Sequence, residues 1–371
     1  MPEHVWALGE TRAAVEEKDV GRLLGALREH TPLSQTALAR MSGLSQSKVS
    51  KLLTGTQPLQ GRDRVDAALA GLGADAQTTM NPFSSGLDLE QCVSDLALLD
   101  SGYARHSSTV LLARAGQIHG RLLDPDVQDP AVVGVRARSA RLMGQLIWDA
   151  SQRRDGPSAI SYLDEAATLA QTVGDHEVQA DALLRKAFVP LYGPRPDAHE
   201  ALVAARHAMA AARDAHTRAV AALHVAEAHA RLDAPYDTDR YLEEADELAH
   251  QAPDLDTQSW TGRRDRIAGS AHLALGRYQR AQELLEQAVP LLTERPKSQG
   301  LVCANLALSH ARQRELDGAV GALHQAMDTV RATRAGGAST LIATAMRELR
   351  AFRTEPAVDE LQDRVIDLLT G

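Results

Sequence analysis

Aromatic residues are scarce in this chain: 12 of its 371 residues are Phe, Trp or Tyr, although 44% are hydrophobic. A core of this composition has to be assembled mainly from Leu, Ala and Val. Sheets are enriched in β-branched and aromatic side chains, so the composition favours closely packed helices instead. We therefore expect an all-α protein.

Cysteines and long apolar runs are also nearly absent. Cys92 and Cys303 are far apart and give neither a disulfide framework nor the spacing of metal ligands, so we expect two reduced core residues and no bound metal. No apolar run approaches the ~20 residues that span a bilayer, and the N-terminus lacks a signal-peptide pattern. These absences predict a cytoplasmic protein that does not enter a membrane.

The common catalytic motifs are missing as well. There is no phosphate-binding glycine loop of the Walker or Rossmann type, no His-Glu-x-x-His and no Gly-x-Ser-x-Gly. Acidic pairs such as Glu243-Glu244 fit solvated helix faces. We expect no enzyme and no cofactor, although a site assembled from separate segments would leave no such motif.

The charge of the chain is unevenly distributed. The whole sequence carries −9, but residues 18–73 hold eight Lys/Arg against four Asp/Glu, a net of +4 that leaves −13 on the rest. A small basic module on an acidic body is typical of a nucleic-acid-binding domain whose attached body repels phosphates.

Within that basic module, residues 34–55 predict two short helices joined by a tight turn. Ser34 and Ser45 are good N-caps, because a side-chain oxygen can accept an otherwise unpaired backbone N–H. Gly43 stands where the chain must turn. The second helix keeps a polar face at its N-terminal end, as reading a DNA major groove requires. That face consists of Gln46, Ser47, Ser50 and Lys51.

This stretch closely resembles the helix-turn-helix of the Cro/C1 (XRE) repressor-like family, over roughly residues 18–73. The matching residues are Leu33-Ser34-Gln35, Leu38-Ala39, Gly43-Leu44-Ser45-Gln46-Ser47, Val49-Ser50 and Gly55, with a further helix from about Asp63 to Leu72. The resemblance implies base contacts by Gln46, Ser47 and Lys51 and phosphate contacts near Gln35 and Thr54. The complete predicted DNA-binding set is Gln35, Gln46, Ser47, Lys48, Ser50, Lys51 and Thr54.

One position departs from the family. Many members pair an arginine of the first helix with a glutamate near the end of the recognition helix. Arg28 matches the first position, but Leu53 occupies the second. We therefore expect this ion pair to be absent.

Three segments divide the chain. Residues 1–73 form the predicted DNA-binding domain, including an extension helix over 3–17 that either packs on this domain or serves dimerisation. Residues 74–87 are turn-rich and form a linker. Residues 88–371 are almost uniformly helical and contain repeats.

The clearest repeat begins at Gly269-Ser-Ala-His-Leu-Ala-Leu-Gly-Arg-Tyr-Gln-Arg-Ala281 and continues to Ala288. It resembles the tetratricopeptide repeat (TPR), in which small residues let the two helices of a hairpin cross closely. Residues equivalent to Ala288 occur at Ala166, Ala208, Ala245 and Ala326, with spacings of 42, 37, 43 and 38 residues along the series. We also expect one further pair over 88–122 and a terminal cap over 338–371.

TPR-like pairs stack into a right-handed superhelix whose concave face is lined by the first helix of each pair. The register predicts a mostly basic set of ligand-binding residues on that face, suited to an anion or to a peptide's carboxylates. The set is Arg141, Trp148, Lys186, Glu227, Arg231, Arg263, Arg266, Asn305 and Arg312. The alternative is that these arginines form salt bridges within the array, with Asp265 or Glu227.

Three histidines, His229, His272 and His310, fall at one equivalent position of successive repeats, with Tyr192 in the preceding one. Adjacent repeats would hold the rings roughly 10 Å apart, too far to share one zinc ion. We expect these side chains to pack between helices.

The overall arrangement resembles the peptide-pheromone-responsive helix-turn-helix/TPR regulators of bacteria. It implies a transcriptional regulator that binds operator DNA as a homodimer and senses a peptide, a small molecule or a protein partner. The alternative is an interaction module that sequesters a partner protein, with DNA binding secondary.

Overall fold

The computed structural model describes residues 5, 9–31, 33–74, 88–123, 129–253 and 255–370. Every regular element in these ranges is a helix. The chain forms two compact units, one made of Met1–Tyr103 with Ser108–Val178, the other of Ala104–Ser107 with Gln179–Gly371. None of the described helices is long and apolar enough to cross a bilayer.

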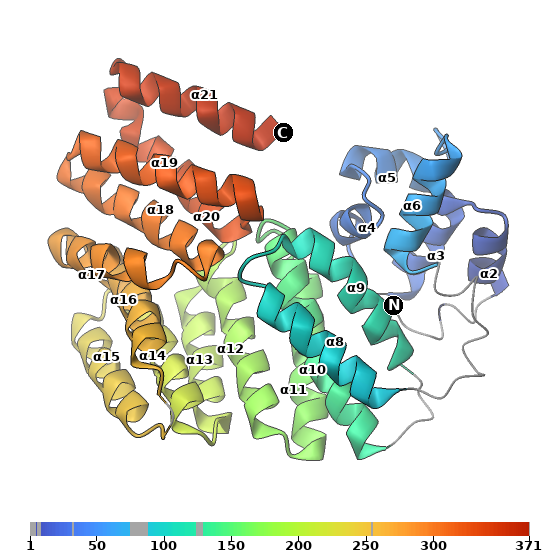
Figure 1. Cartoon of the computed structure of the whole chain (residues 1–371), viewed down its shortest axis with the longest axis horizontal. Coiled ribbons are helices and arrows are strands. Elements are labelled where there is room, and N and C mark those ends of the chain that lie inside the picture. The colour runs from blue at the N-terminus through green and yellow to red at the C-terminus, as the bar shows by residue number, and fades with distance from the viewer. Residues whose placement is uncertain are drawn as a thin grey trace. The chain divides into compact units, whose positions relative to one another are not determined.

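Five short helices are described in residues 9–74 of the first unit (Figure 1). They are α2 (Gly9–Glu16), α3 (Val20–His30), α4 (Gln35–Met41), α5 (Gln46–Leu53) and α6 (Arg62–Leu72). The predicted extension helix over 3–17 is described from Gly9 onward as α2; Trp6 and Leu8, two of its expected apolar residues, lie outside the described residues.

The predicted turn between α4 and α5 is present. Ser34 caps α4 by accepting the N–H of Ala37 at 3.2 Å, and Ser45 caps α5 by accepting that of Lys48 at 3.3 Å. Gly43 takes φ = +68°, a left-handed conformation that costs glycine little. The caps and the turn are therefore formed by the residues from which they were predicted.

Gly71 allows α6 to approach the end of α4 closely. A Cβ placed on this glycine would lie 2.1 Å from the carbonyl oxygen of Met41. Because that neighbour is backbone, no side-chain rotation can relieve the overlap. Gly71 is therefore required for the packing of α6 against the helix pair.

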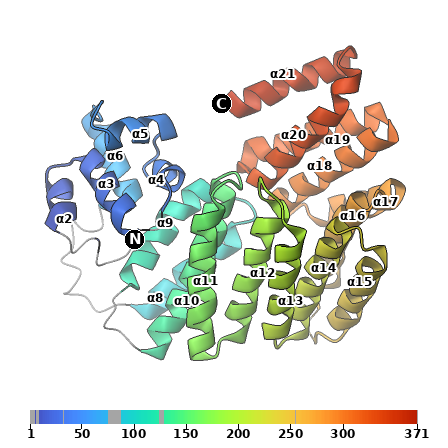
Figure 2. The ribbon, with the colours of Figure 1, turned by 180° about the vertical axis from the view of Figure 1, so that it is seen from behind.

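The first unit continues with two helical hairpins (Figures 1 and 2). The first, α8 (Leu89–Gly102) and α9 (Ser108–Arg121), corresponds to the pair expected over 88–122, and the second is α10 (Pro130–Ala150) with α11 (Gly156–Val173). The predicted boundary at 74–87 stays a prediction, since residues 75–87 lie outside the described residues.

The second unit is a series of further hairpins, entered through α12 (His176–Tyr192). The pairs are α12 with α13 (Ala198–Ala211), α14 (Ala215–Arg231) with α15 (Pro235–His250), α16 (Thr257–Ala274) with α17 (Tyr278–Leu291), and α18 (Pro296–Gln313) with α19 (Leu316–Thr333). The segment α20 (Gly336–Glu348), the short 3-10 helix η1 (Leu349–Phe352) and α21 (Pro356–Thr370) follow where a cap was expected.

The small residues that set the repeat register lie where helices cross. Ala166, Ala208, Ala245, Ala288 and Ala326 are all fully buried, each on the second helix of its pair. On α16, a Cβ on Gly269 would lie 2.7 Å from Leu285 of α17. Thr238, which replaces the expected alanine in the weakest repeat, is fully buried and donates its hydroxyl to the carbonyl of Ala234 at 2.9 Å.

Replacing Gly71 with alanine is expected to destabilise the N-terminal helices by about 3 kcal/mol, the upper end of the usual cost of overpacking. Hydrogen exchange of the amides of α3–α6 in the intact chain measures the effect. Gly25→Ala on α3 is the control, because nothing lies within 4 Å of its added methyl. This control should be neutral or slightly stabilising. Equal protection of the amides from exchange in the two variants would contradict the role of Gly71 in packing α6.

Candidate nucleic-acid interface and ligand site

The N-terminal end of α5 presents its polar side chains to solvent. Gln46, Ser47, Ser50 and Lys51 are all exposed, whereas Val49 and Leu52 are buried and Leu53 is half-buried. Among the described residues Lys51 makes no ion pair. The helix therefore offers amide, hydroxyl and ammonium donors on one side, the groups that read base edges and hold phosphates.

Two members of the predicted DNA-binding set also support their own loop. Lys48 Nζ donates to the carbonyl of Pro58 at 3.2 Å. The hydroxyl of exposed Thr54 donates to the carbonyls of Ser50 at 3.1 Å and Lys51 at 3.2 Å, which closes the C-terminus of α5. These three bonds fix the backbone at the end of α5 and in the loop that follows it.

Arg28 and Leu53 occupy the two positions at which an ion pair was not expected. Arg28 is exposed and has no carboxylate partner among the described residues. Leu53 of α5 is half-buried.

Helix α4 contacts the helices that follow it in the first unit, which the sequence pattern did not reveal. The hydroxyl of Ser34 donates to the carboxylate of Asp155, the residue that caps α11 by accepting the N–H of Ser158. At the other end of α4, the Met41 side chain lies 3.6 Å from where a Cβ on Gly116 of α9 would be.

Arg40 makes α4's contact with these helices electrostatic as well as apolar. Burial, followed by the charge of Arg154, lowers the pKa of Arg40, while Asp155 and Asp149 oppose the shift. Its Nη1 is buried without a hydrogen-bond partner among the described residues. The hydrogen bond from Ser34 to Asp155 thus joins the start of α4 to the α10–α11 turn, and the charges of Asp155 and Asp149 act on Arg40.

Two residues of the predicted ligand set lie in the first unit and are engaged there. Arg141 forms a bidentate pair with Asp100, with bonds of 2.8 and 2.7 Å, and also donates to Gln145 at 3.3 Å. Trp148 is only 7% exposed. For Arg141 the salt-bridge alternative thus describes the geometry, with Asp100 as the partner.

In the second unit, Glu227 joins three successive first helices. Its carboxylate, only 1% exposed, accepts the hydroxyl of Tyr192 from α12 and that of Ser270 from α16, the latter at 2.9 Å. On its own helix it lies 3.3 Å from His224 Nδ1 and 3.6 Å from Arg231. Buried Glu227 therefore links α12, α14 and α16.

These partners set its ionisation. Burial alone would raise the pKa of Glu227, but the hydrogen bond from His224, the charge of Arg231 and the bond from Tyr192 lower it to about 2. Burial lowers the pKa of His224, so the ring is neutral at pH 7 and donates to the carboxylate. The ionised carboxylate of Glu227 is thus surrounded by neutral donors and by the one cation, Arg231.

Other members of the ligand set also have internal partners. Arg231 lies over the ring of Tyr192, 5.4 Å from its centroid, and Arg312 pairs with Glu348 at 3.4 Å. Asn305 is only 7% exposed, and Lys186 is half-buried.

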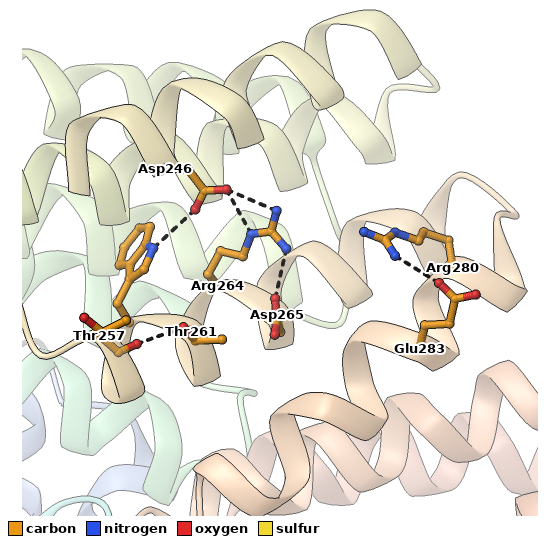
Figure 3. Close-up of polar contacts among 8 residues, drawn as sticks. Asp246, Thr257, Thr261, Arg264, Asp265, Arg280 and Glu283 are labelled. Atoms are coloured by element: carbon orange, nitrogen blue, oxygen red, sulfur yellow. Dashed lines mark hydrogen bonds and ion pairs between the residues drawn. The ribbon is translucent and has the colours of Figure 1, made fainter. Parts of the chain in front are cut away.

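Arg263 and Arg266 differ from these arginines. Both are half-buried on α16, and neither has an ion-pair partner among the described residues. The residue between them that was expected to pair with them, Asp265, binds Arg264 at 2.9 Å instead; Arg264 also contacts Asp246 at 3.1 Å (Figure 3). The salt-bridge alternative therefore holds for Arg231, which pairs with Glu227 at 3.6 Å, and not for Arg263 or Arg266.

The three equivalent histidines pack between helices as predicted. His229 stacks on Tyr241 with ring centroids 5.4 Å apart. His310 lies against Gly318 and donates from Nδ1 to the carboxylate of Glu315 at 2.7 Å. Burial lowers the pKa of His272, with Arg277 acting in the same direction. Each ring is thus a buried part of the packing of its own helical hairpin.

The Glu227 network predicts a pH effect. The folded-state pKa is depressed, so the stabilisation is complete above the ordinary value of 4.5 and is lost as the pH falls toward 2. Glu227→Gln should flatten the loss of stability over this window, measured by denaturant unfolding at several pH values. Glu283→Gln, which removes an exposed pair with Arg280, is the control and should retain the wild-type slope.

Comparisons with known proteins identify a family for the N-terminal helices and a similar fold for the chain. A family model described as "Helix-turn-helix domain" matches residues 19–80. A search among curated proteins found no match. A solved structure titled "Crystal Structure of Rap Protein Complexed with Competence and Sporulation Factor" is similar, with a TM-score of 0.55 and 11% identity, over 99% of this chain and 98% of that one.

At this identity the likeness shows the fold, and it covers the repeats as well as the N-terminal helices. The chain is an all-α protein with an N-terminal helix-turn-helix domain followed by a TPR-like helical-repeat domain.

Proposed function

We propose that this protein is a sequence-specific DNA-binding transcriptional regulator whose TPR-like domain senses a peptide, a small molecule or a protein partner. The observation that carries the proposal is the exposed polar face of α5. Gln46, Ser47, Ser50 and Lys51 project from the second helix of a helix-turn-helix, the helix that enters the major groove in such domains.

Charge supports DNA as the partner. The +4 module is small, and the −13 carried by the rest of the chain disfavours non-specific binding elsewhere. We propose a cytoplasmic, non-enzymatic homodimer that places two α5 helices in half-sites about one helical turn apart.

The ligand-sensing part of the proposal rests on the TPR-like fold. The Rap structure was solved in complex with Competence and Sporulation Factor, as its title states. In this chain, the available arginines Arg263 and Arg266 lie on a first helix of the repeats, where such domains bind their partners.

The contacts of α4 suggest how the two domains communicate. Asp155 holds Ser34, the residue next to the predicted phosphate contact Gln35, so a carboxylate stands where DNA would bring a phosphate. We propose that the α10–α11 turn controls whether α5 is free to bind DNA. A ligand that switches occupancy from one extreme to the other must distinguish the two states by about 5.5 kcal/mol.

Gln46→Ala is expected to cost about 1–3 kcal/mol at one base position of the operator, because an adenine- or guanine-reading amide is lost. Lys51→Ala should weaken binding and reduce its salt dependence. The operator is first isolated by pull-down of genomic fragments, and affinities are then measured by fluorescence anisotropy across a salt titration.

Gln91→Ala is the matched control for Gln46→Ala, since Gln91 is an exposed glutamine of α8 whose side chain donates to Asp95 at 3.0 Å. It should leave DNA affinity unchanged. A lack of sequence-specific enrichment, together with unchanged binding by Lys51→Ala, would exclude the regulator and favour a sequestration module.

Asp155→Asn is expected to raise DNA affinity several-fold at low salt, because it removes a negative charge beside Ser34 while keeping an oxygen that can cap α11. Asp175→Asn is the control: Asp175 accepts the N–H of Val178 at 3.1 Å at the start of α12, but its charge pairs with Arg138 at 3.2 Å. Equal DNA affinities for the two variants would show that Asp155 does not control the access of α5 to DNA.

A further inference from the structure

The α10–α11 turn contains two consecutive residues in a backbone conformation that L side chains rarely adopt. Gln152 and Arg153 have φ values of +51° and +59°, in the left-handed region. Six non-glycine residues in the described part of the chain have a positive φ, and these two are the one adjacent pair among them. The turn therefore carries backbone strain at two neighbouring positions.

The end of α10 accounts for the first of these conformations but not for the second. Gln152 donates its N–H to the carbonyl of Asp149 at 3.0 Å, and Arg153 donates its N–H to that of Trp148 at 3.0 Å. This is the usual pattern after a helix, and it needs a single left-handed residue, here Gln152. The conformation of Arg153 must therefore have another cause.

That cause lies in the hydrogen bonds on both sides of Arg153. The hydroxyl of Ser151, only 1% exposed, donates to the carbonyl of Trp148 at 2.9 Å and accepts the N–H groups of Arg154 and Asp155 at 3.2 and 3.0 Å. The backbone before and after Arg153 is thus fixed to one buried hydroxyl. A strained conformation persists where its surroundings determine it in this way.

Asp155 connects the strained turn to α4. One of its carboxylate oxygens caps α11 by accepting the N–H of Ser158 at 3.3 Å, and the other accepts the hydroxyl of Ser34. Ser34 in turn caps α4 by accepting the N–H of Ala37. Two helix caps therefore meet at one carboxylate, which lies two residues after Arg153 in the chain.

We propose that left-handed Arg153 and the bond from Ser34 to Asp155 form a strained latch, which holds α4 on the α10–α11 turn and releases it at low cost. The inference rests on the proposed function and deepens it, because it names the element that sets how readily the helix-turn-helix leaves Asp155 to bind DNA. Strain in the closed turn is relieved when the turn opens, so a smaller difference in affinity suffices to open it.

A comparison of Arg153→Gly with Arg153→Ala in the intact chain tests the latch. Both variants remove the same charge and side-chain contacts, but only glycine adopts the left-handed conformation without a steric penalty. Arg153→Gly should bind the operator about three-fold more weakly than Arg153→Ala, since the penalty exceeds the extra freedom that glycine loses. Fluorescence anisotropy with the isolated operator measures both affinities.

The same comparison on an Asp155→Asn background should show no difference. Asparagine keeps an oxygen that can cap α11, but it loses the oxygen that accepts the Ser34 hydroxyl. Arg314→Gly and Arg314→Ala are the matched control, because Arg314 has φ = +63° at the end of α18 in the second unit. These two variants should have equal operator affinities.

Hydrogen exchange of the α4 amides in the DNA-free chain gives a second measurement that needs no operator. Exchange should be about three-fold slower in Arg153→Gly than in Arg153→Ala, because the closed turn is favoured.

The outcomes separate the latch from the regulator. Equal operator affinities for the two Arg153 variants, or the same difference on the Asp155→Asn background, would overturn the latch and leave the regulator. Slower α4 exchange in Arg153→Gly, without operator binding by wild type, would overturn the regulator and keep the latch.

Discussion

The structure depends on helices that cross at close range. With few aromatic residues available, the repeats use alanine and glycine at the crossings, as at Gly269 against Leu285 and at the buried series from Ala166 to Ala326. Close crossings bring backbones together and leave little apolar side chain to fill gaps, so any added methyl at these positions meets a neighbour at once. The same constraint acts in the helix-turn-helix, where Gly71 admits α6 against Met41.

Arginine supplies the long side chains that such a slim core lacks, and its role depends on its partner. Arg141 and Arg264 are fixed by carboxylates and contribute to the packing of their units. Arg263 and Arg266 are half-buried without such a partner among the described residues. In the N-terminal domain, exposed Lys51 likewise makes no ion pair within the described part of the chain.

Features that depend on neighbouring residues could be predicted from the sequence, whereas contacts between distant residues could not. N-caps, the Gly43 turn and small residues at helix crossings act over a few residues, so they could be read from the sequence and were found in place. The sequence could not tell Arg264, which has two carboxylates, from Arg263 beside it, because a shift of one residue on a helix turns a side chain by about 100°. The bond between Ser34 and Asp155 joins residues 121 positions apart, and no periodic pattern encodes it.

Glu227 also has a consequence for how the repeats respond to force or to a ligand. In a repeat array, stability is roughly a sum of terms for single repeats and for nearest neighbours, which lets one end open while the other stays folded. A buried carboxylate bonded to both the preceding and the following first helix adds a term that no single repeat contains. Across α12, α14 and α16 the array should therefore open as one cooperative block, with its softer boundaries on either side.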